Sequence, residues 1–195
     1  TMNQTLNYYN TNAQDFIAGT LNVDMSELRN TFTKHLPQEA HILDAGCGSG
    51  RDSLAFKEAG YMVTAIDGSE AMCQQTEALI GQPVRHMVFQ EVEDVQLYDG
   101  IWACATLLHV PDDEMVDVFT RLARALKDGG ILYASFKYGD FEGERNGRYF
   151  TDYTEARFAK LLEHFPELKW IEQGITIDKR PDREEKWLNV IVRKD

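Results

Sequence analysis

Three glycines alternate with other residues in Gly46-Cys47-Gly48-Ser49-Gly50, directly after an apolar run. Glycine is favoured where a turn needs left-handed backbone or where a ligand approaches the backbone closely. Between a strand and a helix, such a turn also presents the unpaired N–H groups of the helix start. The segment therefore predicts a loop of the kind that holds nucleotides, with a plain tight turn as the alternative.

Two carboxylates accompany this loop. Asp67 ends the next apolar run, where a carboxylate can accept both hydroxyls of a ribose; the alternative role is a helix cap before Gly68-Ser69. Asp44 stands inside an otherwise apolar strand end, where a charge is costly without a donor or a cation as partner. A bound amino group would supply such a partner.

His109 follows a predicted strand and is the candidate general base. In doubly wound sheets ligands gather outside the carboxyl ends of the strands, and the pKa of a histidine naturally lies near working pH. The alternative is a histidine that packs at a helix start and touches only the cofactor or the backbone.

A segment from residue 137 to residue 153 combines glycines, aromatic rings and charges, and it is predicted to be a long loop at the same edge of the sheet. Long loops in compact domains are usually functional, and basic side chains there can bind a carboxylate or a phosphate. We predict acceptor binding by four of its residues: Lys137, Tyr138, Arg145 and Arg148. The alternative is a solvated loop whose arginines pair with neighbouring acids.

The elements that position these residues alternate between strands and helices. Apolar runs predict strands at residues 42–45, 61–66, 84–89, 100–105, 131–136, 168–177 and 186–192. Stripes at helical spacing predict helices over segments 13–21, 24–36, 50–60, 69–80, 111–129 and 158–165. This order predicts an α/β fold, a doubly wound, Rossmann-like sheet of seven mostly parallel strands that ends in an antiparallel pair.

We expect one domain over residues 1–195, with an N-terminal helical cap (1–37), a cofactor-binding part (38–136) and a part that holds the acceptor loop and the last strands (137–195). The composition, 43% hydrophobic and 27% charged, is that of a globular protein and excludes a collagen-like or mainly disordered chain. No apolar run is long enough to span a membrane. Cys47, Cys73 and Cys104 lack ligand spacing, so we expect no metal site, and they fit reduced thiols in the cytoplasm.

The net charge of −12 is unevenly distributed. Residues 1–136 carry 19 acidic and 8 basic residues, whereas residues 137–195 carry 13 and 12. An acidic surface repels phosphate backbones, so extended polyanions such as nucleic acids are disfavoured. The nearly neutral remainder still allows a small anionic acceptor.

Residues 43–50, Leu-Asp-Ala-Gly-Cys-Gly-Ser-Gly, resemble the first motif of class I S-adenosylmethionine-dependent methyltransferases. Asp67 matches the ribose-binding acid of that family, and segments 99–102, 108–110 and 126–132 resemble its fourth-strand motif, the continuation of that motif and the turn into strand five. The resemblance covers residues 8–136, and the most similar subgroup is that of the small ubiquinone/menaquinone-type and tellurite-resistance-type enzymes. Asp128 departs from the pattern, because proline is commoner there.

The resemblance implies that the chain binds S-adenosylmethionine and methylates a small-molecule acceptor by in-line displacement in a closed site. The implied cofactor residues are Tyr9, Asp44, Gly46, Cys47, Gly48, Gly50, Arg51, Asp67, Gly68, Gln90, Glu91, Val92 and Ala105. Tyr8 and Tyr9, which precede the first predicted helix, would belong to a segment that closes over the cofactor, with Tyr8 toward the acceptor. Anchoring of that helix in the core is the alternative for the tyrosines, and a surface position is the alternative for Arg51.

Three other functions stay open. Methylation of RNA or protein is the first, and the arginines of segment 137–153 are its support. A non-catalytic cofactor-binding protein is the second. An NAD-dependent oxidoreductase is the third, although its usual G-x-G-x-x-G spacing differs from that of Gly46, Gly48 and Gly50. The sequence does not predict an oligomeric state.

Overall fold

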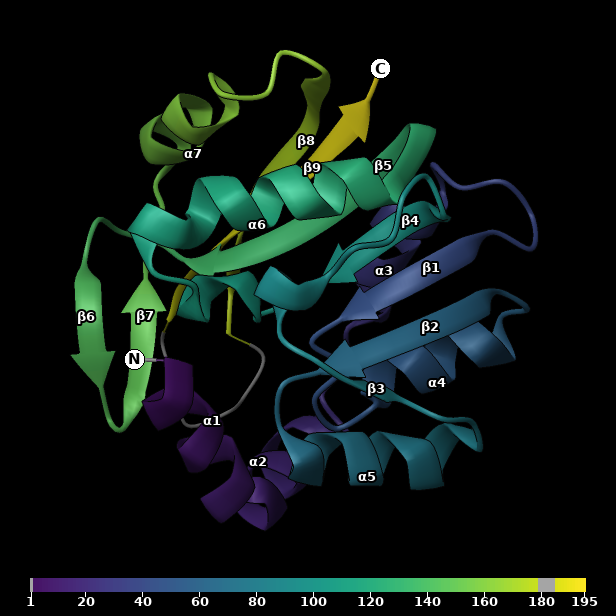
Figure 1. Ribbon diagram of the computed structural model, residues 1–195, viewed down its shortest axis with the longest axis vertical. Helices are drawn as coiled ribbons and strands as arrows, with labels where there is room; N and C mark the ends of the chain where they lie inside the picture. The colour runs from purple at the N-terminus through teal and green to yellow at the C-terminus, as the bar shows by residue number, and fades with distance from the viewer. Residues whose placement is uncertain (1, 179–184) are drawn as a thin grey trace.

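A seven-stranded sheet in the order β3-β2-β1-β4-β5-β9-β8 forms the centre of the computed structural model, which describes residues 2–178 and 185–195 (Figure 1). The strands are β1 (His41–Ala45), β2 (Met62–Asp67), β3 (Arg85–His86), β4 (Tyr98–Ala103), β5 (Leu126–Lys137), β8 (Leu168–Ile177) and β9 (Lys186–Lys194). Strands β1 to β5 pair in parallel, whereas β9 runs antiparallel between β5 and β8. The predicted doubly wound sheet with its antiparallel finish is confirmed.

Helices cover both faces of the sheet. They are α1 (Met2–Thr11), α2 (Ala13–Thr20), α3 (Ser26–Thr33), α4 (Arg51–Glu58), α5 (Glu70–Ile80), α6 (Asp112–Ala125) and α7 (Glu155–Leu162), with the short 3₁₀ turns η1 (Phe89–Glu91) and η2 (Leu107–His109). Successive strand residues point to opposite faces. Leu43 and Ile101 therefore pack with Phe119 of α6, whereas Ile42 and Trp102 belong to the cluster on the other face.

Two predictions about the N-terminal half were wrong. Tyr8 and Tyr9 do not precede the first helix but lie within α1, a largely polar helix whose few apolar residues are Met2, Leu6 and the two tyrosines and which contacts β7 and α5. The third strand is only two residues long, because it pairs with β2 at Ile66 and Asp67 and the chain then turns into η1. Sequence patterns do not report such contacts between distant segments.

The end of α6 also differs from the prediction. Gly129-Gly130 was expected to end the helix, yet α6 ends at Ala125 and β5 begins at Leu126. Leu126 is extended and pairs with Tyr98, and the register of β4 and β5 shifts between Tyr98 and Gly100. The glycines thus lie at an irregularity inside the strand rather than at a helix end.

Segment 137–153 is not an irregular loop, and this prediction was wrong as well. It contains a separate hairpin of β6 (Glu142–Arg145) and β7 (Arg148–Thr151), which lies beside α1 at the edge of the molecule (Figure 1). Asn146 and Gly147 both have positive φ, as the tightest hairpin turns require. That Asn-Gly pair was the sequence signal for the hairpin.

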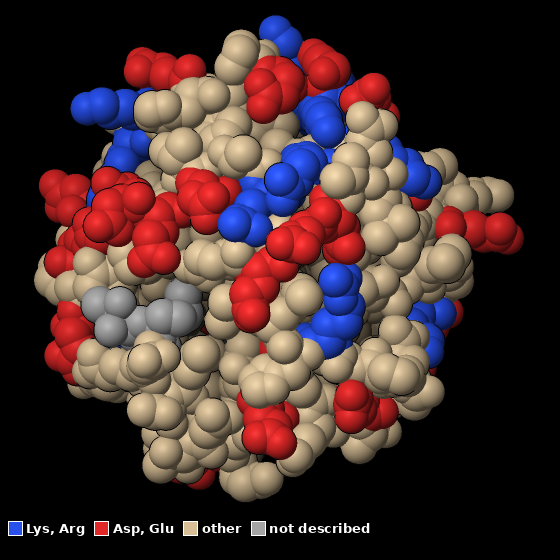
Figure 2. All heavy atoms as spheres, in the orientation of Figure 1, with Lys and Arg blue, Asp and Glu red and all other residues tan. Residues whose placement is uncertain are grey.

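The charge distribution on the surface and the lengths of the helices are two further features of the fold. Lys and Arg side chains are interspersed with Asp and Glu on the face shown in Figure 2. Within residues 2–178 and 185–195, no helix combines the length and the apolar character that crossing a membrane requires.

A buried carboxylate ties the N-terminal helices to the sheet. Asp52 of α4 accepts from Arg29 of α3 at 2.7 Å, from Arg51 at 2.9 Å and from the Trp102 indole at 2.9 Å. Burial alone would raise the pKa of Asp52, but these donors hold it below the ordinary value. Arg51 also donates to the Thr20 carbonyl at 3.1 Å, which extends the network to α2.

Asp52→Ala should lower the free energy of unfolding by about 3–5 kcal/mol, because it leaves buried guanidinium groups without their partner. Urea denaturation followed by circular dichroism measures this change. Asp117→Ala, which removes an exposed i,i+4 partner of Arg121, is the matched control and should cost at most about 1 kcal/mol. Equal effects of the two variants would contradict the role of Asp52.

Candidate functional site

The glycine loop joins β1 to α4 at the carboxyl edge of the sheet. The Gly46 and Cys47 N–H groups both donate to the Ile66 carbonyl at the end of β2. Gly46 has φ +85°, and a Cβ there would lie 2.4 Å from the Thr106 side chain, so no larger residue fits. The loop is therefore fixed against both neighbouring strand ends.

Asp67, at the end of β2, holds the middle of this loop. One carboxylate oxygen accepts from the Gly48 N–H at 3.0 Å and the other from the Ser69 N–H at 2.8 Å. Burial raises the pKa of Asp67, and these two hydrogen bonds oppose that rise. The cap of α5 is Ser69, whose hydroxyl accepts from the Met72 N–H. Each Asp67 oxygen keeps a second lone pair for a ligand.

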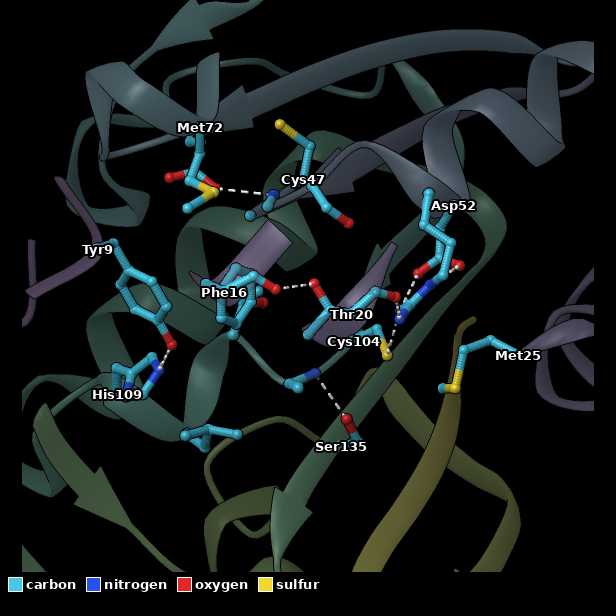
Figure 3. A pocket seen from close by; sticks show the side chains of 18 of the residues that line it. Tyr9, Phe16, Thr20, Met25, Cys47, Asp52, Met72, Cys104, His109 and Ser135 are labelled. Atoms are coloured by element: carbon cyan, nitrogen blue, oxygen red, sulfur yellow. Dashed lines mark hydrogen bonds and ion pairs between the residues drawn. The ribbon is translucent and has the colours of Figure 1, made fainter. Parts of the chain in front are cut away.

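A cavity opens beside the loop and continues along the carboxyl edge to β9 (Figure 3). It brings together eleven of the residues singled out in the sequence: Tyr9, Gly46, Cys47, Gly48, Arg51, Asp67, Gly68, Ala105, His109, Lys137 and Arg148. Side chains of α1 and α2, among them Tyr9, Phe16 and Thr20, form one of its walls (Figure 3). Residues from widely separated segments therefore share one enclosed space.

Five of the expected cofactor residues do not line this cavity: Asp44, Gly50, Gln90, Glu91 and Val92. Gly50 is the N-cap of α4, and Val92 is buried in the core. In η1, Gln90 donates to Glu114, and Glu91 accepts from the Val88 N–H. Their place along the cavity is taken by the residues just before, Met87, Val88 and Phe89, because the short β3 shifts the wall toward the N-terminus.

Two expected acceptor residues and Tyr8 also lie outside the lining. Arg145 is bound by both oxygens of Asp152, at 3.1 and 2.7 Å, and stacks on Phe141. Tyr138 is exposed and donates to Glu155. Tyr8 contributes indirectly, because its ring packs against the Arg148 guanidinium.

Several lining residues were not predicted from the sequence as site residues, among them Phe16, Ser135, Trp187 and Asn189. Asn189 is a buried amide in the apolar run of β9, and this was a signal that could have found it. It accepts from the Tyr133 hydroxyl at 2.5 Å and donates to Thr176 at 2.9 Å. These contacts form a polar floor across β5, β9 and β8.

Ala105, after β4, has left-handed backbone with φ +54°, which is uncommon for a residue with a Cβ. Its N–H donates to Ser135 at 2.7 Å, and the neighbouring Thr106 hydroxyl donates to the Ala45 carbonyl at 2.8 Å. Such conformations persist where the surroundings fix them, and they concentrate at functional sites. The left-handed conformation of Ala105 turns the chain sharply toward η2 and His109.

Arg51 lines the cavity, but Asp52 and the Thr20 carbonyl already occupy its guanidinium. Asp44 lies buried and accepts from the Ser53 hydroxyl at 2.6 Å. Burial, together with the nearby charge of Asp52, raises the pKa of Asp44 to about 7. The donor partner of this carboxyl in the structure is thus a hydroxyl of α4, where the sequence had suggested a bound amino group.

His109 is buried, and both of its ring nitrogens are engaged. Nδ1 lies 2.8 Å from the Tyr149 carbonyl oxygen, which can only accept, so Nδ1 carries the hydrogen. Nε2 accepts from the Tyr9 hydroxyl at 2.7 Å (Figure 3). Burial, together with the cations Arg148 and Lys137, lowers the pKa of His109 to about 3 against the opposing effect of the Tyr149 hydrogen bond. The imidazole is therefore neutral, and the Tyr9 hydroxyl on the cavity wall occupies the lone pair of Nε2.

Arg148 differs from the two other cations predicted to bind the acceptor. Lys137 pairs with Glu185 at 3.0 Å and Arg145 with Asp152 at 2.7 Å. Over residues 2–178 and 185–195, the Arg148 guanidinium has no carboxylate within salt-bridge distance, and its buried Nε has no hydrogen-bond partner. It is held instead between the rings of Tyr8 and Phe150, at 4.6 and 5.1 Å from their centres.

Comparison with known proteins adds independent findings. Residues 42–130 match the family model described as a methyltransferase domain. The chain is similar to the malonyl-[acyl-carrier protein] O-methyltransferase of Salmonella typhimurium (strain LT2), with 34% identity over 99 residues, 49% of this chain and 38% of that protein. It is also similar to the ubiquinone biosynthesis O-methyltransferase of Coxiella burnetii, with 33% identity over 101 residues, 49% of this chain and 42% of that protein. The match spans about two fifths of the length of these relatives.

Among solved structures, the chain resembles the Burkholderia thailandensis 1,6-didemethyltoxoflavin-N1-methyltransferase, which was determined with 1,6-didemethyltoxoflavin and S-adenosylhomocysteine. The TM-score is 0.80, with 24% sequence identity, and the match covers 97% of this chain and 86% of that one. At this identity the similarity establishes the fold.

Asp44→Asn should change how stability depends on pH. A carboxyl whose pKa is raised in the folded state contributes stability that is present at low pH and is lost as the pH rises through about 7. The wild-type protein should therefore lose on the order of 2 kcal/mol between pH 5 and pH 8 that the amide variant keeps. Urea denaturation at both pH values measures the difference.

Asp15→Asn on α2 removes the same charge from an exposed position and is the control. It should follow the wild-type pH dependence. A parallel loss of stability in wild type and Asp44→Asn would show that Asp44 is ionised in the folded protein.

Proposed function

Residues 42–130 match the methyltransferase-domain family model, and from this premise we propose that the chain transfers a methyl group from S-adenosylmethionine to a small-molecule acceptor. The single observation that carries the proposal is the Asp67 carboxylate, fixed against the glycine loop with lone pairs left toward the cavity. A ribose presents two adjacent hydroxyls that such a carboxylate can bind. The short loop between β1 and α4 leaves room for the rest of the nucleoside.

The remaining residues of this end of the cavity fit the same ligand. Gly46 and Gly48 present backbone without side chains, and Met87, Val88 and Phe89 offer an apolar wall for a flat base. When bound, the cofactor supplies a methyl group on a sulfonium, which is already an activated leaving group. The rings of Tyr9 and Phe16 lie on the cavity wall, where they can cover a cation.

Methyl transfer from such a donor requires alignment and exclusion of water more than side-chain chemistry. Orientation of reactants can supply about 7–11 kcal/mol of a barrier. Here α1 and α2 cover the cavity, and the Asp52 network fixes α2 and α3 against α4. We therefore treat residues 1–37 as a cap over the cofactor-binding part (38–136), within one domain that residues 137–195 complete.

His109 is the proposed general base for acceptors that must lose a proton. Its tautomer is fixed by the Tyr149 carbonyl, so that Nε2 can accept a hydrogen. The Tyr9 hydroxyl, 2.7 Å from Nε2, marks the position that an acceptor hydroxyl or amine would take. A base whose pKa lies near the working pH contributes about 10²–10⁴-fold to a rate. The expected pKa near working pH does not hold for His109 in this structure, where burial lowers it to about 3, so its pKa has to rise when the acceptor binds.

The acceptor would lie between His109 and the sheet, against Lys137, Arg148, Phe150 and Trp187. We propose a small molecule with an anionic group, since Arg148 has no carboxylate partner among the described residues, whereas Lys137 of the same wall is paired with Glu185. The relatives and the solved neighbour are named for acceptors that differ from one another, so they do not select one. The three free cysteines support the cytoplasm as the compartment.

Incubation of the protein with isotopically labelled S-adenosylmethionine and a cell extract, followed by mass spectrometry, should show the label on a small molecule. Parallel incubations with RNA and with protein fractions test the alternative acceptors. Label on no acceptor, despite tight cofactor binding, would indicate a non-catalytic cofactor-binding protein. Binding of NAD without binding of S-adenosylmethionine would instead favour an oxidoreductase.

Asp67→Ala should weaken the binding of S-adenosylhomocysteine by about 10- to 100-fold, because it removes the acceptor for both ribose hydroxyls. Isothermal titration calorimetry measures the affinity, and urea denaturation measures stability separately. Glu70→Ala removes an exposed acid three residues away and should leave the affinity unchanged. An affinity unchanged by Asp67→Ala would refute the ribose-binding role.

A further inference from the structure

Three consecutive residues of β7, 148 to 150, lie near His109. The role of His109 as a general base rests on the proposed function. The Tyr149 carbonyl accepts from His109 Nδ1, and the Phe150 ring lies 4.9 Å from the imidazole. The Arg148 guanidinium lies over Tyr9, 5.9 Å from the ring centre, and Tyr9 in turn donates to His109 Nε2. One short strand therefore fixes the base and carries the cation beside it.

The charges that act on His109 come from two strands. Arg148 of β7 and Lys137 of β5 both disfavour a positive imidazole, and Tyr9 of α1 is a neutral neighbour whose pKa is raised by burial. Lys137 is already paired with Glu185. Burial is the largest cause that disfavours a positive imidazole, and the charge of Arg148 adds to it. Arg148 is stacked on rings and has no carboxylate among the described residues to offset that charge.

We infer that Arg148 couples recognition of the acceptor to proton removal: the acceptor's anionic group, by neutralising this guanidinium, makes His109 able to take the acceptor's proton. An anion in contact with the guanidinium largely cancels the electrostatic effect of that cation on a third group nearby. Where water is excluded, the uncancelled effect of a single cation is strong, so its removal matters. Without the anion, His109 stays neutral and holds the Tyr9 hydroxyl.

The inference specifies the acceptor as a class: a small molecule with a carboxylate or similar anion and, at some distance from it, a hydroxyl or amine. As the acceptor atom bonds to the methyl carbon, the carbon–sulfur bond breaks with its electron pair on sulfur. The proton of the hydroxyl or amine passes to His109 Nε2. The imidazolium keeps its Nδ1–H on the Tyr149 carbonyl and returns the proton to solvent when the products leave.

Nuclear magnetic resonance of ¹³C-labelled histidine tests this directly, on the full chain saturated with S-adenosylhomocysteine. The pKa of His109 is followed with no anion, with benzoate and with inorganic phosphate as probes. We expect at least one anion to raise the pKa of His109 by about one unit or more in wild type. The four other histidines (His35, His41, His86 and His164) serve as internal references in the same spectra.

Arg148→Gln should raise the pKa of His109 without any anion and should abolish the response to both probes. Arg148→Lys should retain the response in part, since the charge remains. Lys127→Gln, which removes a half-exposed cation paired with Asp99, is the control and should behave as wild type. Unchanged signals of His35, His86 and His164 show that each variant is folded. His41 is left out of this criterion for Lys127→Gln, because the charge of Lys127 contributes to the lowered pKa of His41.

The coupling is overturned if neither anion shifts His109 in wild type, or if Arg148→Gln leaves its pKa unchanged. Those results would leave the proposed function intact, provided that S-adenosylhomocysteine still binds in calorimetry. Failure of S-adenosylhomocysteine to bind would instead overturn the proposed function itself.

Discussion

The carboxyl edge of the parallel sheet is the constraint on which the rest of this structure depends. Because β1, β2, β4 and β5 run in the same direction, their ends meet at one edge, where backbone groups are left without sheet partners. Gly46, Asp67, Ala105 and Lys137 each stand at such an end, although they span more than ninety residues of sequence. A ligand held at this edge can be contacted by backbone groups that follow several strands at once. Short motifs at the strand ends therefore suffice to build a binding site.

Three aspartates near this edge have different pKa values because their hydrogen-bond donors differ. Asp52 receives two guanidinium groups and an indole, and its pKa falls despite burial. Asp67 receives two backbone N–H groups, which only oppose the effect of burial. Asp44 receives one hydroxyl, and its pKa rises to about 7. The number and charge of the donors, rather than burial, decide whether an acid serves as an ionic anchor, a ligand acceptor or a neutral buried group.

The sequence was sufficient for features that depend on local pattern, and insufficient where distant segments meet. Glycine spacing, strand ends and Asp67 follow from neighbours along the chain, and the sheet order agrees with them. Helix α1 is largely polar and short, and its packing against β7 and α5 joins segments that are far apart in the sequence, so the sequence did not predict it. The pairing of Arg145 with Asp152, and the isolation of Arg148, depend on the register of a hairpin. Two arginines that looked equivalent in sequence therefore have different environments.

The part of the chain that resembles known methyltransferases is not the part that we propose to bind the acceptor. The family model matches residues 42–130, and this stretch contains the glycine loop, Asp67, Ala105 and His109. The wall that we propose for the acceptor, with Lys137, Arg148, Phe150 and Trp187, lies beyond it, on β5, the β6–β7 hairpin and β9. Since the matched stretch ends before this wall begins, similarity to the family cannot identify the acceptor. The identity of the acceptor has to be inferred from the chemistry of that wall, where the Arg148 guanidinium has no carboxylate partner among the described residues. The neutral His109 of the matched stretch faces the same cavity and is held by Tyr149 of the same strand, β7.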